Sequence, residues 1–240
     1  MRDALMVYGE ALADYFRGNK DAVLVSTRED GYVSEAPLWP FFREAEDSPE
    51  IERIALGNCC GYVLDVGAGA GRHSLILQER GLEVCAIDII PQAIEIMRAR
   101  GVQDARLADV ITFDGGPFDT IMMLMHGIGM VETLSDLADY LANVKRLLKP
   151  GGQLLVDSLD VRCTDNPEHL AYHNWLQAHG RYYGEVRMQF SYQGQTCPMF
   201  GWLHVDPQTF GEYADKQDWY FEILHQEESG DYLAKLTEKD

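Results

Sequence analysis

The feature that most constrains the fold is a regular alternation of short apolar runs with helical patterns between Tyr62 and about Val161. Runs typical of buried strands cover residues 62–66, 83–88, 105–107, 118–125 and 153–158. Helical patterns lie between them at 75–80, 91–100 and 135–148, and Pro150-Gly151-Gly152 ends the last one. Strands that alternate with helices form parallel sheets with crossover helices on both faces. The pattern predicts a doubly wound, Rossmann-like α/β sheet.

The flanking segments extend this core. Before it, a helical pattern from Leu5 stops at Gly18-Asn19, an irregular stretch rich in aromatic residues follows, and a short helix covers 49–56. After it, the predicted elements are a helix at 167–178, two strands around Gln193-Gly194, a helix at 207–216 and a closing hairpin of 220–224 with 232–236. We therefore expect a seven-stranded, mostly parallel sheet with a C-terminal antiparallel hairpin and an N-terminal helical cap.

The core and its two flanking segments are expected to have different roles within one domain. We expect residues 1–58 to form the N-terminal cap, residues 59–161 to form the ligand-binding core, and residues 162–240 to supply a substrate-side insertion and the closing strands. A chain of 240 residues with 46% apolar residues can bury a core of this size.

Charge and cysteine usage narrow the function classes. The chain has 20 Lys and Arg against 39 Asp and Glu, a formal net charge of −19, so nucleic acid and membrane surfaces are not expected partners. No apolar run approaches the roughly 20 residues of a membrane span, and Glu10 and Asp14 interrupt any signal-peptide pattern. Five cysteines without a CxxC pair suit a reducing compartment, so we expect a cytoplasmic protein.

The segment with the most chemical information is Val63-Leu64-Asp65-Val66-Gly67-Ala68-Gly69-Ala70-Gly71-Arg72-His73. A glycine-rich turn after the first strand lets the backbone approach a ligand and aims helix N–H groups at it. A dinucleotide fingerprint requires Gly or Ala where Arg72 stands. Asp65, inside the strand, suits an ammonium group and is poorly placed beside a pyrophosphate. The turn is therefore expected to hold a ligand other than a dinucleotide.

These motifs resemble those of the class I S-adenosylmethionine-dependent methyltransferases, and the resemblance covers about 100 residues. Asp65-x-Gly67-x-Gly69-x-Gly71 is similar to the motif that holds the methionine part of the cofactor. Asp88 matches the acidic residue on the ribose hydroxyls, and two hydrogen bonds from a diol suit a carboxylate. Asp109 matches the residue that caps the adenine amino group. Phe118-Asp119-Thr120-Ile121 and Leu148-Lys149-Pro150-Gly151-Gly152 resemble the family's later motifs.

The resemblance implies S-adenosylmethionine as cofactor and S-adenosylhomocysteine as product. It places Ala68, Ile89, Val110 and Met125, which adjoin the matched motifs, among the residues that line the cofactor site. Arg43 is a further candidate, because a folded-back N-terminal segment would bring its guanidinium to the methionine carboxylate. In this family the regions outside the motifs choose the substrate, which we expect to be a small metabolite methylated at oxygen or nitrogen.

Methyl transfer is an in-line displacement, in which positioning contributes roughly 7–11 kcal/mol. A general base is needed only for an acceptor that carries a proton at neutral pH. The best candidate is His126, which directly follows the predicted strand 118–125, at the end of the sheet that faces the cofactor. A structural histidine capping the strand end is the alternative. Further candidates are Asp157, Asp160, Tyr182, Tyr183 and Tyr192.

Other readings stay open at this point. His169 and His173 share a helix face and could bind a metal with Asp165 or Glu168, but a solvated face is the simpler interpretation, so no metal is expected. The alternatives to a methyltransferase are a non-catalytic protein that binds the cofactor, a nicotinamide-dependent oxidoreductase and an aminopropyl transferase. The chain is expected to act as a monomer or a homodimer.

Overall fold

The computed structural model describes residues 5–239, which divide into two compact units. The first unit comprises residues up to 49, residues 60–113 and residues 187–200. The second comprises residues 50–59, residues 114–186 and those from 201 onward. Because three separate stretches of chain build each unit, neither is a contiguous segment, and each is described by itself below.

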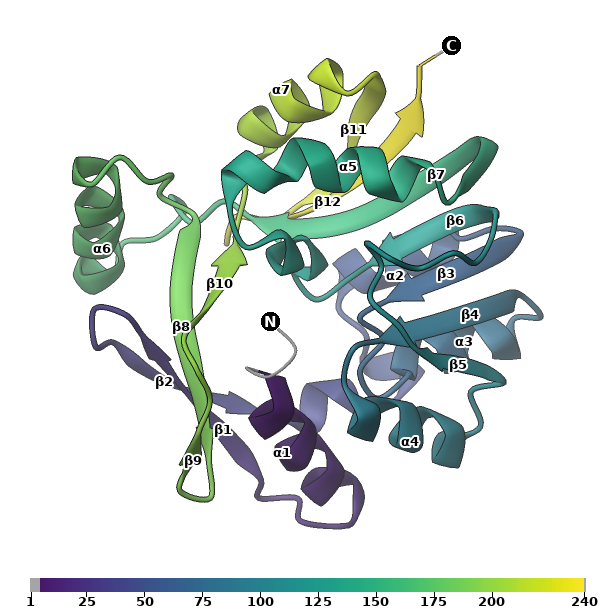
Figure 1. Cartoon of the computed structure of the whole chain (residues 1–240), viewed down its shortest axis with the longest axis horizontal. Helices are drawn as coiled ribbons and strands as arrows, with labels where there is room; N and C mark the ends of the chain where they lie inside the picture. Colours follow the sequence, from purple (N-terminus) through teal and green to yellow (C-terminus); the bar gives the residue numbers. More distant parts are fainter. Residues whose placement is uncertain (1–4, 240) are drawn as a thin grey trace. The chain divides into compact units, whose positions relative to one another are not determined.

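The elements follow one another along the chain as labelled in Figure 1. The strands are β1 Val23–Arg28, β2 Val33–Pro37, β3 Tyr62–Val66, β4 Glu83–Asp88, β5 Asp104–Leu107, β6 Phe118–Met123, β7 Leu148–Leu159, β8 Glu185–Tyr192, β9 Gln195–Thr196, β10 Phe200–Leu203, β11 Trp219–Gln226 and β12 Asp231–Glu238. The α-helices are α1 Met6–Phe16, α2 Glu50–Asn58, α3 Arg72–Glu79, α4 Pro91–Arg100, α5 Leu137–Lys145, α6 Pro167–Ala178 and α7 Pro207–Lys216. Short 3₁₀ helices cover Trp39–Phe41, Ala45–Asp47, Gly127–Val131 and Leu134–Asp136.

The main sheet has the predicted number and directions of strands. Within residues 5–239, seven strands take the order β11-β12-β7-β6-β3-β4-β5. The pairs β3·β4, β4·β5 and β6·β7 are parallel, whereas β12 runs antiparallel to both β7 and β11. The predicted doubly wound sheet with its C-terminal antiparallel hairpin and N-terminal helix is therefore confirmed.

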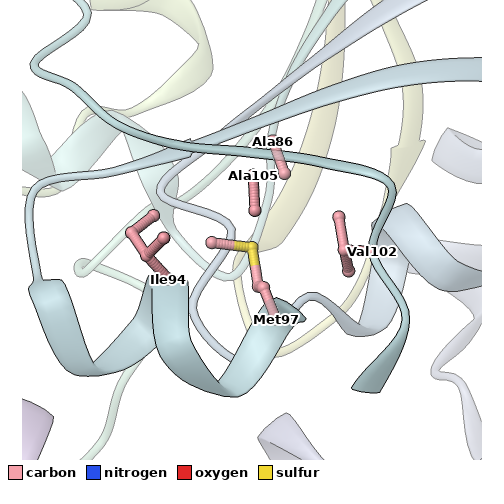
Figure 2. Close-up of a cluster of buried hydrophobic side chains, with 5 residues drawn as sticks. All are labelled: Ala86, Ile94, Met97, Val102 and Ala105. Carbon is pink, nitrogen blue, oxygen red and sulfur yellow. The ribbon is translucent and has the colours of Figure 1, made fainter. Parts of the chain in front are cut away.

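In the first unit, helix α4 packs on strands β4 and β5. Pro91 occupies the first turn of α4, and Gly101, with φ +100°, ends the helix in the left-handed conformation. Between the helix and the strands lies a cluster of five side chains, which point toward one another in Figure 2. They are Ala86, Ile94, Met97, Val102 and Ala105. This cluster lies directly behind the glycine turn, as shown below.

The stretch predicted to be irregular, after Gly18-Asn19, contains a β-hairpin instead. Strands β1 and β2 pair antiparallel, and the other edge of β1 pairs with β8, with Thr27 opposite Gln189. The turn between the two strands includes Gly31, with φ +91°. The prediction was wrong because β1 is stabilised by a partner strand about 160 residues away along the chain, which no local pattern reveals.

In the second unit, helices α5 and α7 contact each other, and α7 packs on β11 (Figure 1). Most of the helix predicted over 135–148 is present as α5, which buries Leu137, Tyr140, Leu141 and Val144. The helix ends at Lys145, however, and strand β7 already begins at Leu148. The expected break at Pro150 lies inside this strand, at a shift of register between Phe118 and Thr120 of the neighbouring strand β6. Such irregular positions tolerate a residue without an N–H group.

Helix α7 shows why the C-terminal helices were predictable. The side chain of Asp206 accepts hydrogen bonds from the backbone N–H groups of Gln208 and Thr209, both at 3.1 Å. Pro207 then opens the helix, which is the preferred place for proline. Among residues 5–239, no helix is long and apolar enough to cross a membrane.

Candidate functional site

The glycine turn after β3 is built from left-handed backbone. Gly67, Gly69 and Gly71 have φ values of +70°, +55° and +75°, which residues with a side chain rarely adopt. The N–H groups of Gly67 and Ala68 both donate to the carbonyl of Ile87, at 2.9 and 3.1 Å. The turn is thus tied to the neighbouring strand β4, and the backbone of Gly69 lies beside the carboxyl end of that strand.

Asp88 ends β4 and is fixed by the turn. Its Oδ2 accepts a hydrogen bond from Gly69 N at 2.9 Å, and its Oδ1 accepts one from Ile90 N at 2.9 Å. Only 6% of the residue is exposed, and this burial raises the pKa of Asp88 to about 6. The Ile89 N–H acts on the carboxylate as those of Gly69 and Ile90 do, and of its four acceptor positions at least one remains for a ligand.

Asp65, inside β3, faces the first turn of α3. Ser74 Oγ donates to Asp65 Oδ2 at 2.6 Å, and the residue is only 2% exposed. Burial raises the pKa of Asp65, whereas the nearby charge of His73 and the Ser74 hydrogen bond act in the opposite direction. A buried carboxylate needs such partners. The chain itself therefore supplies part of the stabilisation that a charge in an apolar strand requires.

The other predicted cofactor residues of this unit lie near the turn and the strand ends. Asp109 is exposed and caps its own loop, since its Oδ1 accepts a hydrogen bond from Ile111 N at 2.9 Å. Val110 is buried, and Ile89 and Ala68 are half-buried. The side chain of Ala68 packs against the apolar cluster behind the turn.

Two aromatic residues that sequence reasoning did not select lie over the glycine turn. A methyl group added at Gly69 would meet Tyr8 Oη at 3.6 Å and Phe41 Cδ1 at 3.8 Å. The rings of Tyr8 and Phe41 meet edge to face with their centroids 5.5 Å apart. Burial and the charge of Asp88 raise the pKa of Tyr8, so its hydroxyl group stays neutral. The helical spacing of Tyr8 in α1 was the available signal, but it indicated only a buried face.

Arg72, the residue that argued against a dinucleotide fingerprint, anchors the segment that carries Phe41 and Arg43. Its Nε donates to the carbonyl of Arg43 at 3.0 Å, and its Nη2 donates to the carbonyl of Glu44 at 3.3 Å and to Ser48 Oγ. The Arg43 guanidinium lies over the Trp39 ring, 6.0 Å from its centre. Arg72 thus holds residues 43–48 at the start of α3.

In the second unit, Met125 and His126 follow β6 in left-handed conformation, with φ values of 61° and 59°. The strand therefore ends at Met123, two residues earlier than predicted. The Asp157 carboxylate accepts hydrogen bonds from the N–H groups of Met125, His126 and Gly127, at 3.0, 2.7 and 3.4 Å. Burial raises the pKa of Asp157 to about 6. Asp157 thus holds the backbone that presents His126.

The imidazole of His126 is oriented by a residue that the sequence did not single out. Its Nε2 lies 2.7 Å from Oδ1 of Asp231, the first residue of β12. The hydrogen bond to His126 is the main reason why the pKa of Asp231 is lowered. Burial opposes ionisation of His126, but Asp231 and the charge of Asp157 outweigh it and raise the pKa of His126. The pair has the geometry of an oriented general base.

A second histidine, also missed, lies against the first. The rings of His126 and His204 are nearly perpendicular, at 80°, with centroids 5.3 Å apart. Trp202, two residues earlier, covers Gly129 so closely that a side chain there would overlap its indole ring. Nothing in the local sequence links residues 202–204 to residues 126–129, so only the fold could reveal this contact.

The remaining predicted candidates have structural partners. The hydroxyl groups of Tyr182 and Tyr183 both donate to Oδ2 of Asp206, the N-cap of α7, with a distance of 2.6 Å for Tyr182. Tyr192 Oη donates to Asp14 Oδ2 at 3.0 Å in the first unit. Asp160 accepts both hydrogen bonds of the Arg162 guanidinium, at 2.8 Å each. Within residues 5–239, no three His, Cys, Asp or Glu side chains group as a metal site would.

Comparison with known proteins identifies the family. A family model described as "Methyltransferase domain" matches residues 31–211. A solved structure of an S-adenosylmethionine-dependent methyltransferase from Bacteroides fragilis, in complex with S-adenosylhomocysteine, is 34% identical, with a TM-score of 0.86 over 99% of this chain and 97% of that one. The chain therefore belongs to the class I S-adenosylmethionine-dependent methyltransferases.

Curated relatives match over shorter stretches. An uncharacterised methyltransferase of Mycobacterium tuberculosis is 36% identical over 158 residues, which are 64% of this chain and 52% of that protein. A ubiquinone biosynthesis O-methyltransferase of Xylella fastidiosa is 33% identical over 117 residues, 45% of each chain. The match thus spans about half the length of these curated relatives.

Proposed function

We propose that the protein transfers a methyl group from S-adenosylmethionine to an oxygen or nitrogen atom of a small metabolite. The observation that carries the proposal is the glycine turn with Asp88 bonded to Gly69 N, in a chain similar over 99% of its length to a methyltransferase that holds S-adenosylhomocysteine. The names of the matched methyltransferases, including one that acts at oxygen, support the reaction type.

The first unit has the groups that such a cofactor requires. We assign the cofactor to the turn residues Gly67, Ala68 and Gly69, with Asp65 on the amino group and Asp88 with Ile89 at the ribose. The carboxylate of Asp88 is pre-oriented by backbone N–H groups, with those of Gly69 and Ile90 at 2.9 Å, and keeps acceptor capacity for the ribose hydroxyl groups. The left-handed backbone at Gly69 leaves space that any side chain would fill.

The assignment of the adenine and the methionine carboxylate completes this site. We assign Asp109 and Val110 to the adenine, Arg43 to the methionine carboxylate and Met125 to the cofactor as well. Arg43 is supported by the hydrogen bonds from Arg72 to the segment 43–48, which fix that segment at the start of α3. Residues 59–161 then hold most of the cofactor-binding residues, and residues 1–58 and 162–240 are left to select the acceptor.

We assign His126 as the base that takes the acceptor proton. When bound, the cofactor would supply a methyl group activated by its sulfonium, which the acceptor would displace so that the carbon–sulfur electron pair stays on sulfur. The chain's own part is to orient the acceptor and receive its proton. Asp231 and Asp157 favour the imidazolium that results.

The acidic surface supports a small-molecule acceptor rather than a nucleic acid. We further propose a cytoplasmic location, for which the odd number of cysteines without a CxxC pair is the support, and a monomer or homodimer as the working form. The buried Arg72, which stands at the third fingerprint position and donates to the backbone of Arg43 and Glu44, argues against a nicotinamide cofactor.

The test is calorimetric titration with S-adenosylmethionine, S-adenosylhomocysteine and NADH, repeated on two variants. We expect micromolar binding of the first two ligands, weakened at least about 100-fold in Asp88→Ala because two charge-assisted hydrogen bonds are lost. Asp104→Ala, which removes a half-buried carboxylate paired with Arg106, is the matched control and should bind normally. Absence of binding contradicts the proposal, NADH binding supports an oxidoreductase, and binding without turnover of any acceptor supports a non-catalytic protein.

A further inference from the structure

Two histidines of the second unit form a pair whose ring nitrogens have complementary hydrogen-bonding roles. His126 belongs to the turn after β6, and His204 directly follows β10. Their rings meet edge to face, with centroids 5.3 Å apart. Gly129 N donates to His126 O at 2.9 Å, so the residues that His204 and Trp202 contact belong to one turn. Residues 202 and 204 therefore bring two side chains against this turn.

The tautomer of His126 follows from its partner. Because Asp231 is a carboxylate, it can only accept, so His126 Nε2 carries the hydrogen. Nδ1 is then the nitrogen with the lone pair when the ring is neutral. The Asp157 hydrogen bonds to Met125, His126 and Gly127 fix the backbone, so the ring has one orientation. His126 therefore offers a hydrogen-bond acceptor and proton acceptor at Nδ1.

The tautomer of His204 follows from its surroundings. Its Nδ1 is buried and has no hydrogen-bond partner among residues 5–239. A buried N–H without a partner is rarer in proteins than an unsatisfied acceptor, so the lone pair belongs at Nδ1 and the hydrogen at Nε2. Burial, and next the charge of His126, lower the pKa of His204 to about 3, so the ring is neutral. His204 therefore offers a donor at Nε2.

The position of His204 is fixed as firmly as that of His126. Its backbone N–H donates to the carbonyl of Gly184 at 2.8 Å. Gly184 passes so close to the carbonyl of His204 that any side chain at 184 would overlap it. The charged or titratable groups that act on the two rings are Asp157, Asp231 and His173. The pair is thus one rigid donor and one rigid acceptor.

We propose that His126 and His204 together recognise the hydroxyl group of a phenolic acceptor, which makes the reaction an O-methylation; this inference rests on the proposed function. A hydroxyl oxygen can accept a hydrogen bond from His204 Nε2, donate its proton to His126 Nδ1 and still keep an electron pair for the methyl carbon. A neutral amine has a single lone pair, which a bond from His204 would occupy. A protonated amine has none.

The strength of the base selects the type of hydroxyl. An imidazole is a useful base for a hydroxyl group with a pKa near 10, as in the tyrosine phenol, and a poor one for an alkanol. The proton moves to His126 Nδ1 as the oxygen–carbon bond forms, and the imidazolium is stabilised by Asp231. The indole of Trp202, which packs on the backbone of Gly129, adds a flat apolar surface suited to an aromatic ring.

Nuclear magnetic resonance of ¹⁵N-histidine-labelled protein saturated with S-adenosylhomocysteine tests the inference without knowledge of the natural acceptor. The two-bond ¹H–¹⁵N spectra report which nitrogen of each ring carries the hydrogen. Phenol and aniline, which share one ring and differ in the nucleophile, are then titrated as probes. We expect Nε2–H tautomers for both histidines, phenol to perturb both rings, and a dissociation constant for phenol about tenfold below that for aniline.

Substitutions at His204 distinguish a role in phenol binding from a role in folding alone. His204→Phe keeps the ring shape but has no N–H, and we expect about tenfold weaker phenol binding. His204→Gln can place an amide N–H near the position of Nε2, and we expect it to bind phenol within about threefold of the parent. His225→Ala removes a histidine paired with Glu227 at 3.6 Å and is the matched control, without effect.

Each outcome is decisive. A hydrogen on His204 Nδ1, or phenol binding no tighter than aniline binding, overturns the inference, and so does normal phenol binding by His204→Phe. Failure of S-adenosylhomocysteine to bind contradicts the proposed function separately, because the tautomers and the phenol titration are then measured in the ligand-free protein.

Discussion

Replacing each of three glycines of the first unit with alanine separates the effects of backbone strain, close packing and ligand binding. Gly71, Gly69 and Gly81 have φ values of +75°, +55° and +83°. An added Cβ at Gly71 would lie 2.7 Å from both Met97 Cγ and Val102 Cγ2, in the buried cluster of Figure 2. At Gly69 it would make ordinary contacts with Tyr8 and Phe41, and at Gly81 it would meet nothing within 4 Å.

The magnitudes follow from these surroundings. Placing alanine in left-handed backbone costs roughly 1–2 kcal/mol, which is the whole effect expected for Gly81→Ala. Gly71→Ala adds overpacking of roughly 1–3 kcal/mol, for a total loss of about 2–5 kcal/mol in the free energy of unfolding. For a chain of this length that corresponds to a fall in Tm of about 4–20 °C. Gly69→Ala should lose only as much stability as Gly81→Ala.

Ligand binding should show a different ranking, with Gly69→Ala as the variant that loses affinity. The methyl group of Gly69→Ala fills the space below Tyr8 and Phe41, and we expect S-adenosylhomocysteine affinity to fall about 10–100-fold. Gly71→Ala and Gly81→Ala, measured well below their Tm, should bind within about fivefold of the parent. Thermal unfolding followed by circular dichroism and calorimetric titration provide the two readouts.

Two results would refute this reasoning. If Gly71→Ala is no less stable than Gly81→Ala, the cluster around Met97 and Val102 can adapt, and the close packing behind the turn is not a constraint. If Gly69→Ala binds S-adenosylhomocysteine normally, the space over Gly69 is not where the cofactor lies, and its proposed assignment to the turn fails.

The remaining predictions concern three charged residues, Asp88, Asp157 and Arg72. Because burial raises the pKa of Asp88 to about 6, S-adenosylhomocysteine affinity should fall by up to about tenfold per pH unit as the pH drops below 6. The variant Asp88→Asn should bind weakly, with an affinity that does not change over the same pH range. The contribution of Asp88 to stability has the opposite sign: it is fully present below pH 3.8 and lost as the pH rises through 6, as urea unfolding would show. Asp157→Ala leaves the N–H groups of Met125 and His126 without their acceptor and should lower the free energy of unfolding by about 2–4 kcal/mol, as measured with urea. A loss below about 0.5 kcal/mol, as for a surface substitution, contradicts the role of Asp157 in holding this turn. Arg72→Lys should cost about 1–3 kcal/mol and speed tryptic cleavage after Arg43, because lysine cannot reproduce the guanidinium fork; unchanged cleavage contradicts the anchor.

The parts of the fold that sequence reasoning predicted well are those with local signals. Helices α6 and α7 were predicted to the residue, because an N-cap side chain and a proline mark each start and polar periodicity marks each length. The alternation of apolar runs with helical patterns predicted the sheet, and the spacing of the glycines after β3 predicted the turn, which the structure shows beside Asp88. These signals act between residues that are close in the chain.

What only the tertiary structure decided are contacts between distant segments. Strand β1 is stabilised by β8, which follows about 160 residues later, and so looked irregular by itself. Tyr8 reaches the glycine turn because α1 packs in the first unit, and Asp231 and His204 reach His126 because β12 and β10 bring them there. A local pattern sets which face of an element is buried, but the partner on that face is selected by the free energy of packing the whole chain. The sequence by itself therefore determined the sheet, the glycine turn and Asp88, the acidic residue that ends β4. The aromatic cover of the turn and the two-histidine pair were decided by the fold.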